Sequence, residues 1–284
     1  MIWADYSDRL PKDFNLYLKG DDHIGSAACS FKTIQAEVKI IVDDPIGWWM
    51  HLGDAAESIY VDDPRFSLAL HGGRDALVND QVNRWFKLHE PAIPKLLAIL
   101  DGNHEDRLKN TVDIVRLISD KIKDRVGIDI DYGGYTIVAR LSKKFKLFAT
   151  HGSRQVESQA GELRQRQVNE EIRVKRLLRD LRGDCKVMAM GHIHKMRICP
   201  PSYDFYLAGE KKFDHIYPEE FVSSEGIIHP DSRWYCSTGS AAKIYIDVTT
   251  WAETRMFKPA ELGMIKIEVR DGRVRDVRKE IIRA

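Results

Sequence analysis

Five short motifs rich in histidine and aspartate occur along this chain, each at or just past the end of an apolar run. They are Asp21-Asp22-His23, Gly53-Asp54, Gly102-Asn103-His104-Glu105, His151-Gly152 and Gly191-His192-Ile193-His194. Divalent transition metals at hydrolytic sites bind imidazole nitrogens and carboxylate oxygens. The motifs supply enough ligands for two metal ions, placed where strands are expected to stop and loops to begin.

The spacing within two of these motifs suits metal binding. Asp21 and His23 are two residues apart, so at an extended strand end both side chains would leave on the same side and reach one ion. His192 and His194 have the same spacing. A slight twist of their backbone would let each histidine serve a different ion.

Two ions about 3.5–4 Å apart can hold both the attacking and the leaving oxygen of an in-line displacement. Such a pair needs one bridging carboxylate and several terminal ligands. Gly53 allows a sharp turn after a buried strand, which would bring Asp54 close to the metals. Asn103 offers a neutral carbonyl oxygen, which suits a site already crowded with anionic ligands. The motifs therefore predict a dinuclear phosphoester hydrolase.

The ordered motifs resemble the signature of the calcineurin-like metallophosphoesterase superfamily from Asp21 to His194. The resemblance implies an α/β fold of the α+β sandwich type, with two packed mixed β-sheets flanked by helices and metals at the carboxyl ends of strands. It also implies seven metal ligands in two groups joined by one carboxylate. Asp21, His23 and His194 would hold the first metal, Asn103, His151 and His192 the second, and Asp54 would bridge them.

The resemblance gives two further residues of the third motif a role. His104 would stand beside the metals and protonate the leaving oxygen or stabilise the phosphoryl group, and Glu105 would support the loop or orient His104. Two cations lower the pKa of a bridging water, so a hydroxide for in-line attack on phosphorus exists near neutral pH. Manganese is the expected metal, while iron, zinc and nickel also suit these ligands. Arg107 could grip a phosphate, cap a helix or pair with Asp106.

Departures from two branches of the superfamily narrow the substrate. Residues 53–58 lack the longer G-D-x-V-D-R-G motif of the serine/threonine protein phosphatases, and residues 55–57 lack the tyrosine ligand of the purple acid phosphatases. Residues 101–107 are similar to bacterial, archaeal and phage-type members, with SbcD-type nucleases as distant relatives. We expect a phosphodiesterase acting on DNA or RNA. The alternatives are a phosphomonoesterase for a small metabolite or nucleotide, and a non-catalytic scaffold subunit.

The composition is that of an ordinary soluble protein. The 284 residues are 43% hydrophobic and 31% charged, with a formal charge of +1, so no global field points to nucleic acid or membrane. We expect one domain over residues 1–284. The four scattered cysteines favour buried thiols in a reducing compartment. The charged amino-terminal residues and the lack of an apolar run of about 20 residues predict a cytoplasmic protein without a signal peptide, and a homodimer is possible.

Strands alternate with helices along the chain, which argues for an α/β fold with a strand-rich tail. Strands are expected at 14–18, 48–52, 95–100, 135–139, 145–149, 186–190, 234–237, 242–248 and 264–269, with a turn at Asp271-Gly272. Helices are expected at 31–42, 111–122 and 162–181, and residues 67–89 are unevenly helical. Residues 200–235 are expected to form an irregular elaboration near the active site.

Some side chains could have either a structural or a functional role. The basic helix at 162–181 is either solvated with internal ion pairs or a contact for a phosphate backbone. The aromatics of 200–235 pack within their loop or stack on a base; they are Tyr203, Phe205, Tyr206 and Tyr217. Five histidines outside the motifs are expected to be structural, namely His51, His71, His89, His215 and His229.

Overall fold

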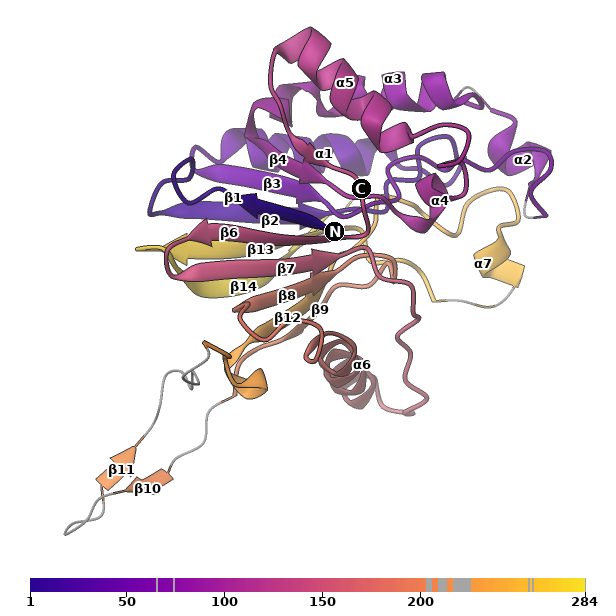
Figure 1. Cartoon of the computed structure of the whole chain (residues 1–284). Helices are drawn as coiled ribbons and strands as arrows, with labels where there is room; N and C mark the ends of the chain where they lie inside the picture. The colour runs from indigo at the N-terminus through magenta and orange to yellow at the C-terminus, as the bar shows by residue number, and fades with distance from the viewer. Residues whose placement is uncertain are drawn as a thin grey trace.

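Two six-stranded mixed sheets form the centre of this chain in a computed structural model (Figure 1). The structure describes residues 1–64, 66–73, 75–202, 206–208, 214–216, 226–254, 256 and 258–283. The first sheet is ordered β14 (Arg273–Ile281), β13 (Gly263–Arg270), β2 (Phe14–Lys19), β3 (Gly47–His51), β4 (Leu96–Ile99) and β5 (Asp131–Tyr132). The second sheet is ordered β1 (Ile2–Asp5), β6 (Thr136–Ser142), β7 (Phe145–Thr150), β8 (Val187–Met190), β12 (Trp234–Ser237) and β9 (Arg197–Cys199).

Helices cover the outer faces of both sheets (Figure 1). The longer helices are α1 (Phe31–Asp43), α3 (Val78–His89), α5 (Ile114–Val126) and α6 (Leu163–Leu178). The short ones are α2 (Leu68–His71), α4 (Asn103–Asp106) and α7 (Trp251–Thr254), with 3-10 turns at Glu90–Lys95 and Pro230–Ser232. Within the described residues, no helix has both the length and the apolar character that crossing a membrane requires.

Three apolar clusters fix this layering. Side chains of both sheets, such as Leu16 and Leu147, share one core between the sheets. A second core joins the first sheet to α1, α3 and α5, and a third joins the second sheet to α6, where Val174 packs with Met188. The structure is therefore an α/β sandwich of two mixed sheets, as the sequence predicts at this level.

The direction of the central strands positions the site. β2, β3 and β4 run parallel to one another, and β7, β8 and β12 do the same in the second sheet. All side chains of β2, β4 and β8 are buried, which is typical of parallel strands covered on both faces. The carboxyl ends of parallel strands meet at one edge of a sheet, so the residues that follow them are brought together.

Most of the expected elements are confirmed within a few residues, but two predictions need correction. Residues 242–248 are not a strand. Only Ala242 makes an isolated bridge, to Cys29, and the Thr250 hydroxyl donates to the carbonyl of Ile244, closing a loop instead. The helix expected from residue 111 begins at Ile114, because the Asp113 side chain accepts a hydrogen bond from the backbone N–H of Arg116 and caps it there.

The irregular stretch 200–235 is only partly described. It contains the two-stranded pair β10 (Tyr206–Ala208) and β11 (Asp214–Ile216), which Figure 1 shows on the side of the sheets away from α4 and α7. Residues 203–205, 209–213 and 217–225 lie outside the described residues, as do the side chains of all four aromatics expected to stack on a base. The expectations about stacking and about this stretch as an active-site elaboration therefore stay predictions.

A buried charge network ties α1 and α3 to the carboxyl ends of β2 and β3. The Lys19 ammonium lies 2.8 Å from Asp22, 3.1 Å from Glu37 and 2.9 Å from Nε2 of His89, and His51 lies 3.0 Å from Asp22. All five side chains are at most 1% exposed. Burial alone lowers the pKa of Lys19, but the two carboxylates outweigh that effect and hold the pKa above its usual value.

Replacing Lys19 should destabilise the fold strongly. Lys19→Met leaves the buried carboxylates of Asp22 and Glu37 without their cation, and breaking such a buried pair costs about 3–5 kcal/mol. Urea unfolding of the unmodified protein and of Lys19→Met, followed by circular dichroism, measures the difference in the free energy of unfolding. Lys39→Met, which breaks an exposed ion pair with Asp43, is the matched control and should change little. Equal stability of the two variants would contradict the importance of the network.

Candidate metal centre

All seven predicted ligands lie at the carboxyl ends of neighbouring strands. Asp21 and His23 follow β2, Asp54 follows β3 and Asn103 opens α4 after β4. The remaining three come from the second sheet: His151 follows β7, and His192 and His194 follow β8. The structure brings this set together around one locus from positions up to 173 residues apart in sequence (194 − 21).

The backbone at these positions is in an unusual conformation. Of the eight non-glycine residues with positive φ among those described, five are predicted ligands: Asp21, His23, Asp54, His192 and His194, with φ between 51° and 70°. Such a conformation costs about 1–3 kcal/mol per residue and clusters at functional sites. The i, i+2 pairs thus reach the site through left-handed turns. This corrects the expectation of an extended strand end, because the chain must bend at each motif.

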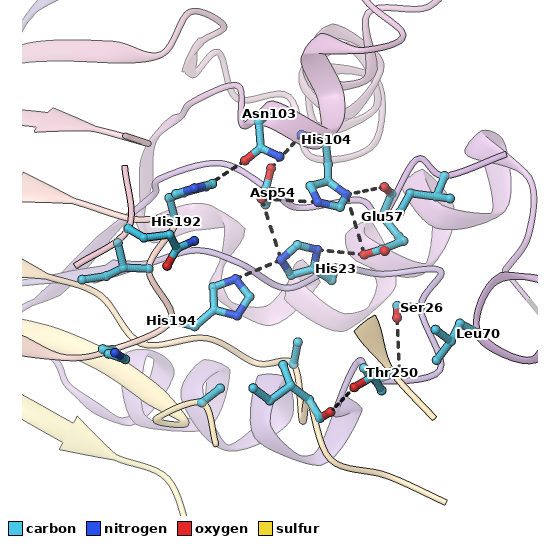
Figure 2. Close-up of a pocket in the computed structure, with 18 of the residues that line it drawn as sticks. His23, Ser26, Asp54, Glu57, Leu70, Asn103, His104, His192, His194 and Thr250 are labelled. Carbon is cyan, nitrogen blue, oxygen red and sulfur yellow. Dashed lines mark hydrogen bonds and ion pairs between the residues drawn. The ribbon is translucent and has the colours of Figure 1, made fainter. Parts of the chain in front are cut away.

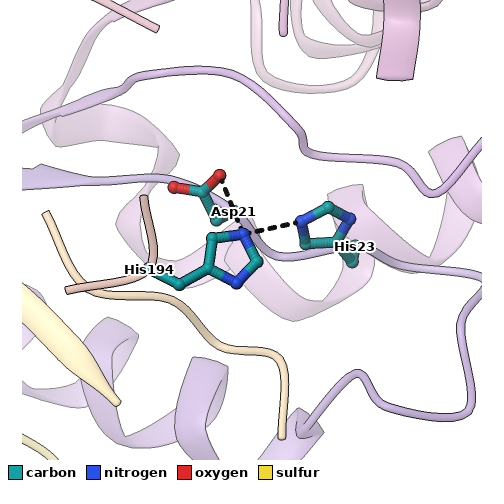
Figure 3. Close-up of side chains that lie close together, drawn as sticks. All are labelled: Asp21, His23 and His194. Carbon is teal, nitrogen blue, oxygen red and sulfur yellow. Dashed lines mark hydrogen bonds and ion pairs between the residues drawn. The ribbon is translucent and has the colours of Figure 1, made fainter. Parts of the chain in front are cut away.

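One group of ligand atoms surrounds His194 (Figure 3). Its Nε2 lies 3.3 Å from Oδ1 of Asp21 and 3.2 Å from Nε2 of His23. These three residues could hold a metal ion. The grouping is the one that the resemblance implies for the first metal.

A second group surrounds Asn103 (Figure 2). Its Oδ1 lies 2.8 Å from Nδ1 of His192 and 3.0 Å from Nε2 of His151. Asp54, His151 and His192 form another cluster that could hold a metal ion. Oδ2 of Asp54 is 3.4 Å from Nε2 of His151 and 3.7 Å from Nε2 of His23, so this carboxylate lies between the two groups.

The protonation pattern of His151 fits a cation in the second group. Its Nδ1 lies 2.8 Å from the carbonyl oxygen of Leu52, which can only accept, so Nδ1 carries the hydrogen. In the neutral ring, Nε2 is then an acceptor, yet it faces the Oδ1 acceptor of Asn103 at 3.0 Å. In the neutral ring two lone pairs would point toward each other, and either a proton or a metal ion between them would satisfy both.

The buried carboxylates and imidazoles of this cluster shift each other's pKa values. Burial raises the pKa of Asp54, but the imidazoles of His151 and His104 outweigh it and hold the pKa well below its usual value. Burial lowers the pKa of His151, but chiefly the Asp54 carboxylate brings it up to about 9. The buried carboxylates and imidazoles thus stabilise each other's charged forms, and divalent cations would replace the protons.

Glu105 supports the loop through backbone hydrogen bonds, and none of its described hydrogen bonds is to the His104 side chain. Its carboxylate accepts backbone hydrogen bonds from Asp54 at 3.0 Å, Ala56 at 2.9 Å and Gly102 at 2.8 Å. Burial and the Asp54 carboxylate raise the pKa of Glu105 to about 7. Of the two roles considered for Glu105, the structure therefore favours loop support.

His104 has one ring nitrogen held and the other directed toward the metal ligands. Nδ1 lies 2.6 Å from the backbone carbonyl oxygen of Glu57 and must donate to it. Nε2 lies 4.0 Å from Oδ2 of Asp54. The backbone N–H of His104 also donates to Oδ1 of Asp54. His104 thus lies beside the two groups of predicted ligands, and Nε2 is the ring nitrogen that is not committed to a backbone acceptor.

A cavity of about 350 Å³ adjoins the ligand groups. Metal-site residues and His104 line one part of it, while another part is apolar and includes Ile59, Leu70, Ile193 and Ile244. Arg107 also lines the cavity and pairs with Asp63 at 3.5 Å, not with Asp106 as one alternative held. Arg107 is also the C-cap residue of α4, as another alternative held, and its contact with a substrate stays a prediction.

The other expectations about side chains have mixed outcomes. His51 and His89 are structural, within the Lys19 network. On α6, Arg173 donates to the Glu157 carbonyl and Lys175 pairs with Asp231. Both partners lie outside the helix, so neither alternative for its basic side chains is decided. Cys185 and Cys236 are buried, Cys29 and Cys199 are half-buried, and all four are free thiols.

Two residues of the site were not predicted as functional. Glu57 contacts His23, with its Oε2 2.8 Å from Nδ1, and forms a third metal-capable cluster with His23 and His104. His71, expected to be structural, has its Nε2 3.3 Å from Glu57. The only sequence signal for Glu57 is its position three residues after Asp54, and none distinguishes His71.

No family model matches the chain, and no curated protein matches it either. The assignment of function therefore depends on the motifs and on the geometry of the site.

Gly102 is the position at which the smallest change should damage the site. A Cβ there would collide with Oδ1 and the backbone nitrogen of Asp54, so Gly102→Ala should displace the central carboxylate and weaken metal binding by about 10-fold or more. Metal content after dialysis against Mn²⁺, measured by mass spectrometry, checks this. Gly161→Ala, where a Cβ meets nothing within 4 Å, should bind metal normally. Normal metal content in both variants would contradict the prediction.

Proposed function

We propose that this chain is a dinuclear metal-dependent phosphoester hydrolase of the calcineurin-like type. The observation that carries the proposal is the position of Asp54, whose Oδ2 lies 3.7 Å from His23 and 3.4 Å from His151, between two ligand groups. A bridging carboxylate needs that position. The order of the motifs and the two-sheet α/β architecture support the same conclusion.

The ligands divide as the two groups suggest. Asp21, His23 and His194 would hold one ion, and Asn103, His151 and His192 the other, with Asp54 shared. Manganese suits this set of imidazole and oxygen ligands, as do iron, zinc and nickel. Bound divalent cations supply a water of lowered pKa and neutralise charge on the phosphoryl oxygens.

His104 would act on the substrate directly. Because its Nδ1–H is held by the Glu57 carbonyl, Nε2 is the nitrogen that can carry a second proton. A protonated Nε2 beside the cavity could donate to the leaving oxygen or stabilise a phosphoryl oxygen. Arg107, on the wall of the same cavity, would bind a phosphate oxygen of the substrate.

A phosphodiester, with DNA or RNA as the leading example, is the proposed substrate. The cavity also favours a second candidate, a phosphomonoesterase for a small metabolite or nucleotide. Its volume of about 350 Å³ and its apolar wall suit one compact group beside the phosphate. A non-catalytic scaffold is the least economical alternative, because all seven ligands that the motifs require are present and converge.

His104→Ala should separate chemistry from metal binding. We expect both ions to remain, because His104 is not among the proposed ligands, and kcat to fall by about 10²–10⁴-fold, the contribution of a general acid. Hydrolysis of bis-nitrophenyl phosphate with Mn²⁺, alongside metal analysis, measures both effects. His229→Ala, an exposed histidine, is the control. Asp54→Ala should abolish activity and metal retention together, and full metal retention in that variant would remove the bridging role.

Substrate preference should distinguish the two candidate activities. We expect bis-nitrophenyl phosphate to be hydrolysed faster than the mono ester, and we expect single- or double-stranded DNA or RNA to release nucleotides at a rate that falls as salt rises. A higher kcat/KM for the mono ester would favour the phosphomonoesterase. Absence of nucleotide release at every Mn²⁺ concentration, with the nitrophenyl diester still hydrolysed, would reject nucleic acid as the substrate.

A further inference from the structure

Glu57 lies beside His23 and His104 at the edge of the cluster of predicted ligands (Figure 2), and His71 approaches it from α2. Its Oε2 is 2.8 Å from Nδ1 of His23 and 3.8 Å from Nδ1 of His104, and its Oε1 is 3.3 Å from Nε2 of His71. Glu57, His23, His71 and His104 are each at most 9% exposed. A buried carboxylate in these surroundings has few partners other than these rings.

The hydrogen-bond pattern fixes which nitrogen of His71 carries a hydrogen. The backbone N–H of Ser67 donates to Nδ1 of His71 over 2.9 Å, so Nδ1 is an acceptor. In the neutral ring, Nε2 is then the protonated nitrogen, and it points at Oε1 of Glu57. Nε2 of His71 therefore donates to the Glu57 carboxylate, and the hydrogen bond from the Ser67 backbone sets the orientation of the ring.

The direction of a hydrogen bond also fixes which nitrogen of His23 carries a hydrogen. Oε2 of Glu57 can only accept when the carboxylate is ionised, so Nδ1 of His23 donates to it. Nε2 of a neutral His23 is left with its lone pair, and this atom faces Nε2 of His194 at 3.2 Å. Each hydrogen bond thus orients the next group, from the Ser67 backbone to the ligand nitrogen of His23.

We propose that Glu57 and His71 are positioning residues that fix the tautomer and ring orientation of His23 and so set the affinity of the first metal site. This inference rests on the proposed function only in taking His23 as a ligand through Nε2. Carboxylates that receive the second nitrogen of a ligating histidine also raise its basicity, and losing such a partner costs about 10–100-fold in metal affinity or activity.

The alternative role for His71 is packing. Its ring lies 5.7 Å from that of Phe66, and it ends α2, so the ring could simply anchor residues 66–73. Phenylalanine would keep a ring of similar shape but would lose the donor, whereas glutamine would lose the ring but keep an N–H able to reach Glu57. His71→Phe and His71→Gln therefore separate the two roles.

The test is titration of the metal-free full-length protein with Mn²⁺ by calorimetry, together with thermal unfolding of the metal-free form. We expect His71→Phe to weaken one of the two binding steps by about 10-fold or more with little change in Tm. His71→Gln should stay within about 3-fold of the unmodified protein at that step. Normal binding by His71→Phe, or equal losses in both variants, would overturn the role of His71.

Glu57→Gln provides a second variant. An amide that accepts from His23 through its oxygen must place its NH₂ against the N–H of His71, two donors facing each other. In the reverse orientation the amide pushes the hydrogen of His23 onto Nε2, the ligand atom. We therefore expect the same binding step to weaken by about 10–100-fold, and His71→Ala in the Glu57→Gln background should restore part of the loss. Unchanged binding in Glu57→Gln would overturn the inference.

Failure of this inference can be told apart from failure of the proposed function. If Asp54→Ala loses metal while the Glu57 and His71 variants bind normally, the metal centre stands and the positioning role is wrong. If Asp54→Ala binds two ions as tightly as the unmodified protein, the proposed metal centre itself is wrong.

Discussion

The site depends on one backbone constraint: the parallel strands must turn immediately after they end. At three motifs the turn passes through a residue in the left-handed region whose side chain is a predicted metal ligand. Asp54, His192 and His194 are examples, with φ of 53°, 70° and 53°. An aspartate tolerates this conformation better than most residues, and histidine is also enriched there. The strain is sustained because the strands that lead into these turns are mostly or fully buried, so the sheet fixes the turns.

Buried charge is the second requirement, and the Asp21-Asp22-His23 motif divides it between two places. Asp21 and His23 face the metal-ligand cluster, while Asp22 between them accepts from Lys19 and His51 in the neighbouring network. Alternate side chains of one short turn therefore serve two separate functions. The Lys19 network anchors α1 and α3 at the strand ends, next to the predicted ligands Asp21 and His23.

The sequence predicted most of the central strands, and it predicted that the candidate ligands lie at their carboxyl ends, because both depend on local signals. Buried parallel strands appear as short apolar runs, and a ligand directly after such a run needs no long-range information to be placed at the sheet edge. Residues 242–248 show the limit: Ile244, Ile246 and Val248 alternate as in a strand, but the segment loops beside the cavity and pairs with a strand edge nowhere along its described length. Alternation of apolar and polar residues indicates that a segment has two different faces. It does not show that a neighbouring strand is available for pairing.

The order of the motifs in the sequence did not identify Glu57 and His71 as residues of the site. A residue that orients a ligand is chosen by the direction of a hydrogen bond, and that direction depends on a backbone donor such as the N–H of Ser67. Nothing in the spacing of residues 57, 67 and 71 requires this meeting, because α2 and the loop before it bring them together. Residues 66–73 lie outside every metal-binding motif, yet His71 contacts Glu57, and Glu57 in turn accepts from Nδ1 of His23, a proposed ligand. If the proposed metal centre is correct, movement of that segment would alter the position of His23, and metal binding would in turn favour the conformation in which His71 contacts Glu57.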